Sequence, residues 1–205
     1  MTAEPAFASD ARHREAIATF SDLLDRAREA GDPEPGAMTL ATCDAQGRVS
    51  ARIVLLKGVD ARGFRFFTNR LSAKGEQLAA HPGVALCFHW KTLPGQVQVR
   101  VEGRADPLSD AESDAYFATR SRGSQVGAWA SRQSRELPDR ATFEARIAEI
   151  EQRFAGREVP RPPHWGGYLV VPDRMEFWYG ADFRLHERIL YERAGDGWSR
   201  RLLYP

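Results

Sequence analysis

The amino-acid sequence predicts a mainly β protein with helices (α+β), built as an antiparallel β-barrel decorated with helices. Roughly seven or eight short apolar runs, each bounded by turn residues, indicate strands. In one of these runs Val97, Val99 and Val101 alternate with polar residues, so one face of that strand should be buried. A few helical segments interrupt the strands, and together these observations favour the decorated barrel.

The N-terminal segment is expected to form an arm followed by one helix. Residues 1–12 are small and polar and are predicted to be mobile. Apolar residues then recur at helical spacing before Gly31-Asp32-Pro33, at Ile17, Phe20, Leu23, Leu24 and Ala27. We therefore divide the chain into an arm and helix over residues 1–36 and a single domain over residues 37–205.

The β pattern begins at Ala37. Turn residues around 44–47 and 60–63 separate the first three runs, which indicates an antiparallel meander. A short helix is expected over residues 72–80, and the last strands follow a segment rich in Pro and Gly at 157–168. The predicted strands cover residues 37–43, 49–56, 64–68, 84–90, 96–105, 168–171, 174–180, 184–193 and 198–204.

Two further helices are predicted in the middle of the chain. Ser109 and Glu112 form a capping box that starts a helix running to about Arg120. The second helix is marked by four apolar residues, Phe143, Ile147, Ile150 and Phe154.

Composition excludes several classes of protein. The chain has 205 residues, 42% of them hydrophobic, and 29 basic against 28 acidic residues give a net charge of +1. No basic stripe suits nucleic acid, and no apolar run suits a signal peptide or a membrane span. Cys43 and Cys87 lie in strand-like runs and are expected to be buried free thiols, which favours a cytoplasmic location.

Two groups of residues have the chemistry of a binding site. In a regular strand Arg184, His186 and Arg188 would project from one face, either as a solvated edge or toward an anionic or π-rich ligand. Tyr116 and Arg120 stand at i and i+4, with Ser124 just beyond the predicted helix end. This second group suits a phosphate monoester, although surface hydrogen bonding is the simpler interpretation.

Other candidate residues are more ambiguous. Arg52 and Lys57 bracket an apolar strand and would face opposite ways unless a bulge intervenes. Trp165, Phe177 and Trp178 are more typical of a core than of a cofactor platform. The sequence contains no GxGxxG, Walker, HExxH or CxxC motif, so no dinucleotide fold, P-loop or metal site is expected.

Several segments, taken in order and spacing, resemble the pyridoxine/pyridoxamine 5'-phosphate oxidase family of FMN-binding split barrels. The resemblance runs from about Ala37 to Pro205. The segments that carry it are RIVLLK at 52–57, FTN at 67–69, SDAYFATRSRGSQVGAWAS at 113–131 with Gln133-Ser134, EVPRPPHWGGY at 158–168, MEFWYG at 175–180 and RLHER at 184–188.

The resemblance implies an oxidase that converts pyridoxamine or pyridoxine 5'-phosphate to pyridoxal 5'-phosphate with FMN and molecular oxygen, releasing hydrogen peroxide. It implies that FMN is bound by Arg52, Ile53, Val54, Leu55, Leu56, Lys57, Phe67, Thr68, Lys74, Gln98, Gln133, Ser134, Trp178 and Arg188. It implies that the substrate is bound by Lys57, Tyr116, Arg120, Ser124, Arg184, Leu185 and His186, with Arg184 and His186 as the catalytic pair.

The family pattern also implies a homodimer with each flavin in a cleft between two barrels, and the apolar strands at 84–90 and 52–56 agree with it. Two departures stand out, since the family often has Tyr at Phe67 and Arg at Ala73. Gln96 and Gln98 both compete for the flavin-contacting position, and spacing to Gly103 favours Gln98. The alternatives are a non-catalytic flavin- or haem-binding split barrel and a flavin reductase.

Overall fold

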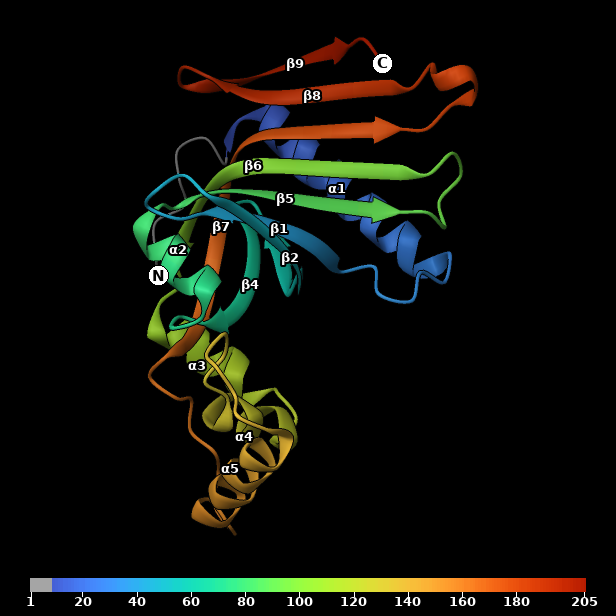
Figure 1. Ribbon diagram of the computed structural model, residues 1–205. Coiled ribbons are helices and arrows are strands. Elements are labelled where there is room, and N and C mark those ends of the chain that lie inside the picture. The colour runs from blue at the N-terminus through green and yellow to red at the C-terminus, as the bar shows by residue number, and fades with distance from the viewer. Residues whose placement is uncertain (1–8) are drawn as a thin grey trace.

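A computed structural model describes residues 9–205 of the chain, and within them nine strands form one strongly curled antiparallel sheet. Figure 1 shows the sheet with helices α3 to α5 gathered at one end and strands β8 and β9 at the other. The predicted β-barrel with helices is therefore confirmed. Predictions for residues 1–8 lie outside the described residues.

Helix α1 (Ala11–Glu29) starts earlier than the sequence pattern indicated, so residues 11 and 12 are helical rather than mobile. Asp10 caps the helix, because its side chain accepts hydrogen bonds from the backbone N–H groups of Arg12 and His13. The apolar face predicted from spacing is buried, with Phe20 and Ala27 fully covered.

The sheet has the strand order β2-β1-β5-β6-β7-β4-β3, and β8 and β9 continue from β7. All pairings are antiparallel. The first strands are β1 (Ala37–Cys43), β2 (Val49–Leu55), β3 (Gly58–Asp60) and β4 (Gly63–Asn69), followed by α2 (Ala73–Ala80), β5 (Gly83–Trp90) and β6 (Val97–Pro107). The predicted meander of the first three runs is wrong beyond its first hairpin: β1 pairs with β2, but β4 pairs with β3 and β7 rather than with β2.

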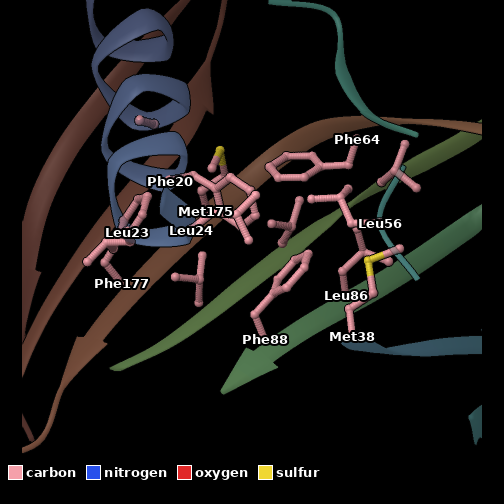
Figure 2. Close-up of a cluster of buried hydrophobic side chains, with 14 of the residues drawn as sticks. Phe20, Leu23, Leu24, Met38, Leu56, Phe64, Leu86, Phe88, Met175 and Phe177 are labelled. Atoms are coloured by element: carbon pink, nitrogen blue, oxygen red, sulfur yellow. The ribbon is translucent and has the colours of Figure 1, made fainter. Parts of the chain in front are cut away.

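The main core lies between α1 and the inner face of the sheet (Figure 2). Phe20 of α1 packs edge-on against Phe64 of β4 and Phe88 of β5, each with ring centroids 4.8 Å away. Aromatic pairs in this geometry stabilise a fold beyond their buried area. The alternation predicted in β6 is also confirmed, because Val97, Val99 and Val101 are buried.

The helical end of the molecule contains α3 (Asp110–Ala118), α4 (Arg122–Ala130) and α5 (Arg140–Arg153), packed around a second apolar cluster. The capping box of Ser109 and Glu112 is present. However, α3 ends at Ala118, so the prediction that Arg120 lies on this helix is wrong. No periodic pattern predicted α4, whose glycines at 123 and 127 lower helix propensity.

Strand β7 (Trp165–Tyr179) is one continuous strand of 15 residues where two strands were predicted. It is followed by a 3₁₀ turn, η2 (Asp182–Arg184), and by β8 (Glu187–Ala194) and β9 (Gly197–Leu203). The prediction that Arg184, His186 and Arg188 share one strand face is wrong. Phe183 and Arg184 adopt positive φ angles of 56° and 64°, so the chain turns there, and only Arg188 lies in a strand.

Cys43 and Cys87 are free thiols as predicted, but both are only partly buried. Within residues 9–205, none of the helices combines the length and the apolar character that crossing a bilayer requires.

Candidate active site

A pocket of about 690 Å³ lies between the barrel and the helical end of the molecule. Strands β2 and β4, the start of α2 and the segment from Tyr116 to Gln133 form its walls. The residues that line it are Arg52, Ile53, Val54, Leu55, Lys57, Phe67, Thr68, Asn69, Lys74, Tyr116, Arg120, Ser121, Ser124, Gly127, Ala128, Ser131, Gln133 and Trp165. The volume is within the range of small-molecule and cofactor sites.

One end of the pocket carries two cations, Arg52 and Lys74. The Arg52 guanidinium donates to Leu40 O at 3.0 Å, Thr42 Oγ1 at 2.6 Å and Ser50 Oγ at 2.6 Å. Burial lowers the pKa of Arg52, and burial together with the nearby Arg52 lowers the pKa of Lys74. Two cations that lie close together in a partly buried position favour the binding of an anion between them.

Lys74 also connects the barrel to the loop after α4. Its Nζ donates to Gln133 Oε1 at 3.0 Å and to Thr68 Oγ1 at 3.3 Å. Lys74 occupies the first turn of α2, where Ser72 is the N-cap. The positive end of the helix dipole therefore adds to the charge of this cluster.

The opposite wall carries Tyr116, Arg120 and Ser124, the group predicted for a phosphate. Arg120 stands between α3 and α4, and Ser124 lies in the first turn of α4. Arg120 Nη1 is buried and has no hydrogen-bond partner within residues 9–205, and burial lowers the pKa of this guanidinium. A buried guanidinium nitrogen without an acceptor is costly, so this wall fits an anionic ligand.

Parallel aromatic rings support this wall. The rings of Phe67 and Tyr116 stack with centroids 3.9 Å apart, and Trp165 lies 5.4 Å from Phe67. Gly167 leaves room for this stack, because a Cβ at that position would come within 2.6 Å of the Phe67 ring. Phe67 lacks the hydroxyl of the tyrosine that the family often has at this position, but its ring still stacks on Tyr116.

Lys57 lies just after the end of β2. The alternation of side chains along that strand, which would have pointed Lys57 and Arg52 in opposite directions, therefore does not apply to Lys57. Both residues line the same pocket. Lys57 is an exposed cation at the mouth, whereas Leu56 is buried in the main core and takes no part in the pocket lining.

A second group of predicted residues lies elsewhere in the chain. Trp178 and His186 line a separate pocket of about 410 Å³ that shares no lining residue with the first. Their rings are 4.5 Å apart, and the Ala181 N–H donates to His186 Nδ1 at 3.1 Å. Arg184 and Leu185 are exposed beside this pocket.

Gln98, Trp178 and Arg188 are cross-strand neighbours on β6, β7 and β8. Arg188 Nε donates to Glu176 Oε1 at 2.8 Å, and Arg188 Nη1 donates to the backbone oxygen of Tyr204 at 3.1 Å. Gln96 precedes β6 and has a positive φ of 58°, so it does not share a strand face with Gln98. Ser134 has a positive φ of 69° next to Gln133 and does not line the first pocket.

The residues present fit FMN and a second phosphorylated ligand, because the pocket lining combines the cation pair Arg52 and Lys74 with a third cation, Arg120, that has an unpaired nitrogen. Arg52 and Lys74 would hold the flavin phosphate, and Arg120 would face the other anion. Sequence reasoning missed Asn69, Ser121, Gly127, Ala128 and Ser131 in the lining. Its assignment of Trp165 to a core is confirmed, and this residue lines the pocket as well. The Ser121 N-cap of α4 was the one local signal that could have revealed part of this wall.

Comparison with known proteins agrees with this geometry. Residues 24–154 match the family model described as pyridoxamine 5'-phosphate oxidase. Residues 165–205 match the model described as pyridoxine 5'-phosphate oxidase C-terminal dimerisation region. The chain is 56% identical to a pyridoxine/pyridoxamine 5'-phosphate oxidase of Myxococcus xanthus (strain DK1622), over 92% of this chain and 91% of that protein.

Further relatives extend the same picture. A pyridoxine/pyridoxamine 5'-phosphate oxidase of Anaeromyxobacter dehalogenans is 58% identical over 92% of this chain and 94% of its own length. The crystal structure of PhzG from Burkholderia lata 383, solved in complex with tetrahydrophenazine-1-carboxylic acid, superposes with a TM-score of 0.87 at 36% identity and covers 92% of both chains. An FMN-binding protein from Nostoc punctiforme, at a TM-score of 0.73, 19% identity and coverage of 92% of this chain and 96% of its own, shares the fold. The chain therefore belongs to the pyridoxamine 5'-phosphate oxidase family.

Proposed function

We propose that the protein is an FMN-dependent oxidase that converts pyridoxamine 5'-phosphate or pyridoxine 5'-phosphate to pyridoxal 5'-phosphate. Molecular oxygen accepts the electrons and leaves as hydrogen peroxide, and the amine substrate also consumes water and releases ammonia. One observation carries the proposal. Arg52, Lys74 and the half-buried Arg120 line the same pocket, and Arg120 has an unpaired nitrogen.

Arg52, Thr68, Lys74 and Gln133 would hold the phosphate end of FMN, because Lys74 contacts Thr68 and Gln133 at the start of α2 and Arg52 lies close enough to lower the pKa of Lys74. When bound, FMN supplies the acceptor for the hydride that leaves the substrate carbon. A terminal phosphate suits this cluster, and the sequence has no dinucleotide-binding motif, so FMN is preferred over FAD.

The substrate phosphate would bind Lys57, Tyr116, Arg120 and Ser124 on the opposite wall of the pocket. A charge-assisted contact to the guanidinium fixes one end of the substrate, and this leaves the pyridine ring facing the flavin. Catalysis then depends mainly on positioning, since hydride transfer needs the reacting atoms about 3–3.5 Å apart.

Arg184, Leu185 and His186 would reach this pocket from a second copy of the chain. Three facts support a homodimer in which each site draws on both copies. The two pockets share no lining residue. Phe183 and Leu185 are 92% and 70% exposed beside the second pocket, where large apolar side chains favour a partner surface. The part of the chain that contains them matches a dimerisation region.

Subunit complementation tests the shared site. Arg120→Glu and Arg184→Glu variants should each be nearly inactive at low substrate concentration. Co-expressed and randomly paired, they should recover roughly a quarter of the wild-type sites, because each mixed dimer contains one intact site. Recovery of no activity from dimers shown to be mixed would contradict the shared site.

The proposed reaction is tested by an aerobic assay of the purified protein with pyridoxamine 5'-phosphate, following peroxide and aldehyde together. The protein should be yellow and should release FMN on denaturation. Bound flavin without turnover would favour the non-catalytic flavin-binding alternative, and bound haem would favour the haem-binding one. Turnover that requires a nicotinamide cofactor would favour the reductase.

A cytoplasmic location is part of the same proposal. Cys43 and Cys87 are both free thiols, and protein disulfides are rare in reducing compartments.

A further inference from the structure

Arg120 is held in an unusual way for a cation that faces a phosphate. It lies two residues after the end of α3 and two residues before the start of α4, so it belongs to neither helix. Within residues 9–205 it forms no ion pair, and its Nη1 has no hydrogen-bond partner. Instead, its Cζ lies 4.7 Å from the centre of the Trp165 ring and 5.6 Å from that of Phe117.

Trp165 itself is firmly anchored. Its side chain is only 6% exposed. Its backbone N–H donates to Pro162 O at 3.0 Å, and its backbone oxygen accepts from Arg161 Nη1 at 2.7 Å. Arg161 in turn pairs with Asp110 and Asp114 of α3, the helix that carries Tyr116. The backbone of Trp165 is therefore connected through Arg161 to the helix of another phosphate candidate.

Trp165 also belongs to an aromatic stack with Phe67 and Tyr116. Their three planes are parallel to within 16°. Such rings can hold Tyr116 and Arg120 at a fixed separation without a polar group in between.

An aromatic ring suits this task better than a carboxylate. A carboxylate partner would orient Arg120 but would also occupy its donors and neutralise its charge. A ring face attracts the cation by about 0.5–1 kcal/mol when exposed and about 2 kcal/mol when desolvated, and it leaves the N–H groups free. This agrees with the unpaired Nη1 in the pocket.

We propose that Trp165 is a positioning residue that holds Arg120 by a cation–π contact, so that its free N–H groups meet the substrate phosphate. Trp165 then determines the preference for phosphorylated over unphosphorylated substrates by orienting Arg120. This inference rests on the proposed function of the pocket.

The test compares Trp165→Leu, Trp165→Phe and a matched control, Trp129→Phe. Trp129 also lies against an arginine, at 4.9 Å from Arg153 Cζ, but it does not line the first pocket. In Trp165→Leu the KM for pyridoxamine 5'-phosphate should rise roughly 5- to 30-fold, the equivalent of about 1–2 kcal/mol. The kcat, the FMN content and the KM for unphosphorylated pyridoxamine should change by less than about twofold, since Arg120 acts on the phosphate alone.

Trp165→Phe should give a smaller rise, because the weaker ring is retained, and it keeps the test valid if Trp165→Leu does not fold. Trp129→Phe should behave as wild type. Calorimetric titration of the purified protein with inorganic phosphate gives a second readout that needs no turnover, and its dissociation constant should rise in the Trp165 variants. If the wild type does not oxidise pyridoxamine 5'-phosphate, the proposed function fails while the phosphate titration still tests Trp165. A folded Trp165 variant with wild-type KM and wild-type phosphate affinity would overturn the inference.

Discussion

The backbone N–H of Ala181 donates a hydrogen bond of 3.1 Å to Nδ1 of His186. Because Nδ1 is the acceptor, the proton of the neutral imidazole must lie on Nε2. The nearby Trp178 ring, 4.5 Å away, further limits rotation of the imidazole. His186 is therefore arranged to donate a hydrogen bond from Nε2, which is the opposite of what a general base must do.

This arrangement predicts the result of two substitutions at one position. His186→Gln keeps an N–H donor near the position of Nε2 and should retain most of the turnover. His186→Ala should lower kcat roughly ten- to a hundredfold, as expected for loss of a hydrogen bond to a charged or reacting group. Steady-state kinetics with pyridoxamine 5'-phosphate measure kcat for both variants. If the glutamine variant is as inactive as the alanine variant, His186 is a base or nucleophile and the donor role is wrong.

Arg120→Ala should raise the KM for the phosphorylated substrate and leave bound FMN unchanged. The expected rise is roughly 10- to 150-fold, corresponding to about 1.5–3 kcal/mol for a charge-assisted contact. Arg140→Ala, which removes an exposed arginine of α5 paired with Glu144, is the control. Flavin loss in Arg120→Ala with normal substrate affinity would reverse the two phosphate assignments.

The loop after α4 should control how long FMN stays bound. Arg135 of this loop pairs with Glu76 of α2 and donates to Leu71 O at 3.1 Å, next to the Gln133–Lys74 contact. Exposed ion pairs contribute at most about 1 kcal/mol, so Glu76→Gln should speed FMN release up to roughly fivefold at low salt and have little effect at high salt. Flavin fluorescence after dilution measures the rate.

Two further variants complete that experiment. Glu144→Gln breaks a comparable exposed pair away from the pocket and should leave FMN release unchanged. Exchanging the charges, with Glu76→Arg and Arg135→Glu together, should restore part of the retention if the pair itself is responsible. A Glu76→Gln effect that persists unchanged in high salt would rule out the ion pair as its cause.

His13 should make the fold sensitive to mild acid. It is fully buried in α1, donates from Nε2 to Ala61 O at 2.9 Å and lies 4.9 Å from the Trp198 ring. Burial lowers its pKa, against smaller opposing effects of the Ala61 contact and the charge of Asp10. The unfolded chain therefore takes up the proton more readily, and the free energy of unfolding should fall as pH drops below about 6.5.

Urea unfolding at pH 7.5 and pH 5.5 measures this effect. His13→Gln should have a lower free energy of unfolding than wild type at pH 7.5. The decrease in this free energy between pH 7.5 and pH 5.5 should be smaller in the variant than in wild type. His81→Gln, which changes an exposed histidine, should keep the full difference. An unchanged pH dependence in His13→Gln would show that another group is responsible.

The sequence was most informative where one periodicity held over a whole element. The face of α1 and the alternation in β6 are decided by burial alone, so both could be read directly. The end of α3 and the existence of α4 could not be predicted from the sequence. Ser121 and two glycines lower the helix propensity of α4, which is stabilised by packing against α5.

The site residues could likewise be predicted only where the local pattern of the sequence matched the backbone. The residues of the first pocket came from the resemblance and from local chemistry, and most of them lie together. Arg184 was misplaced because the strand pattern runs on through RLHER, whereas the backbone turns with positive φ at Phe183 and Arg184. These left-handed angles at non-glycine residues have no signature in the sequence.

Strand β7 begins at Trp165 and ends at Tyr179, so it runs from the first pocket to the second. At about 3.3 Å per residue a strand of this length can span up to roughly 45 Å. In the proposed shared site, each chain would supply one half-site at each end of β7 and would need a second copy to complete either of them. Specific activity should therefore depend on protein concentration, falling on dilution as copies separate and returning when the protein is concentrated again.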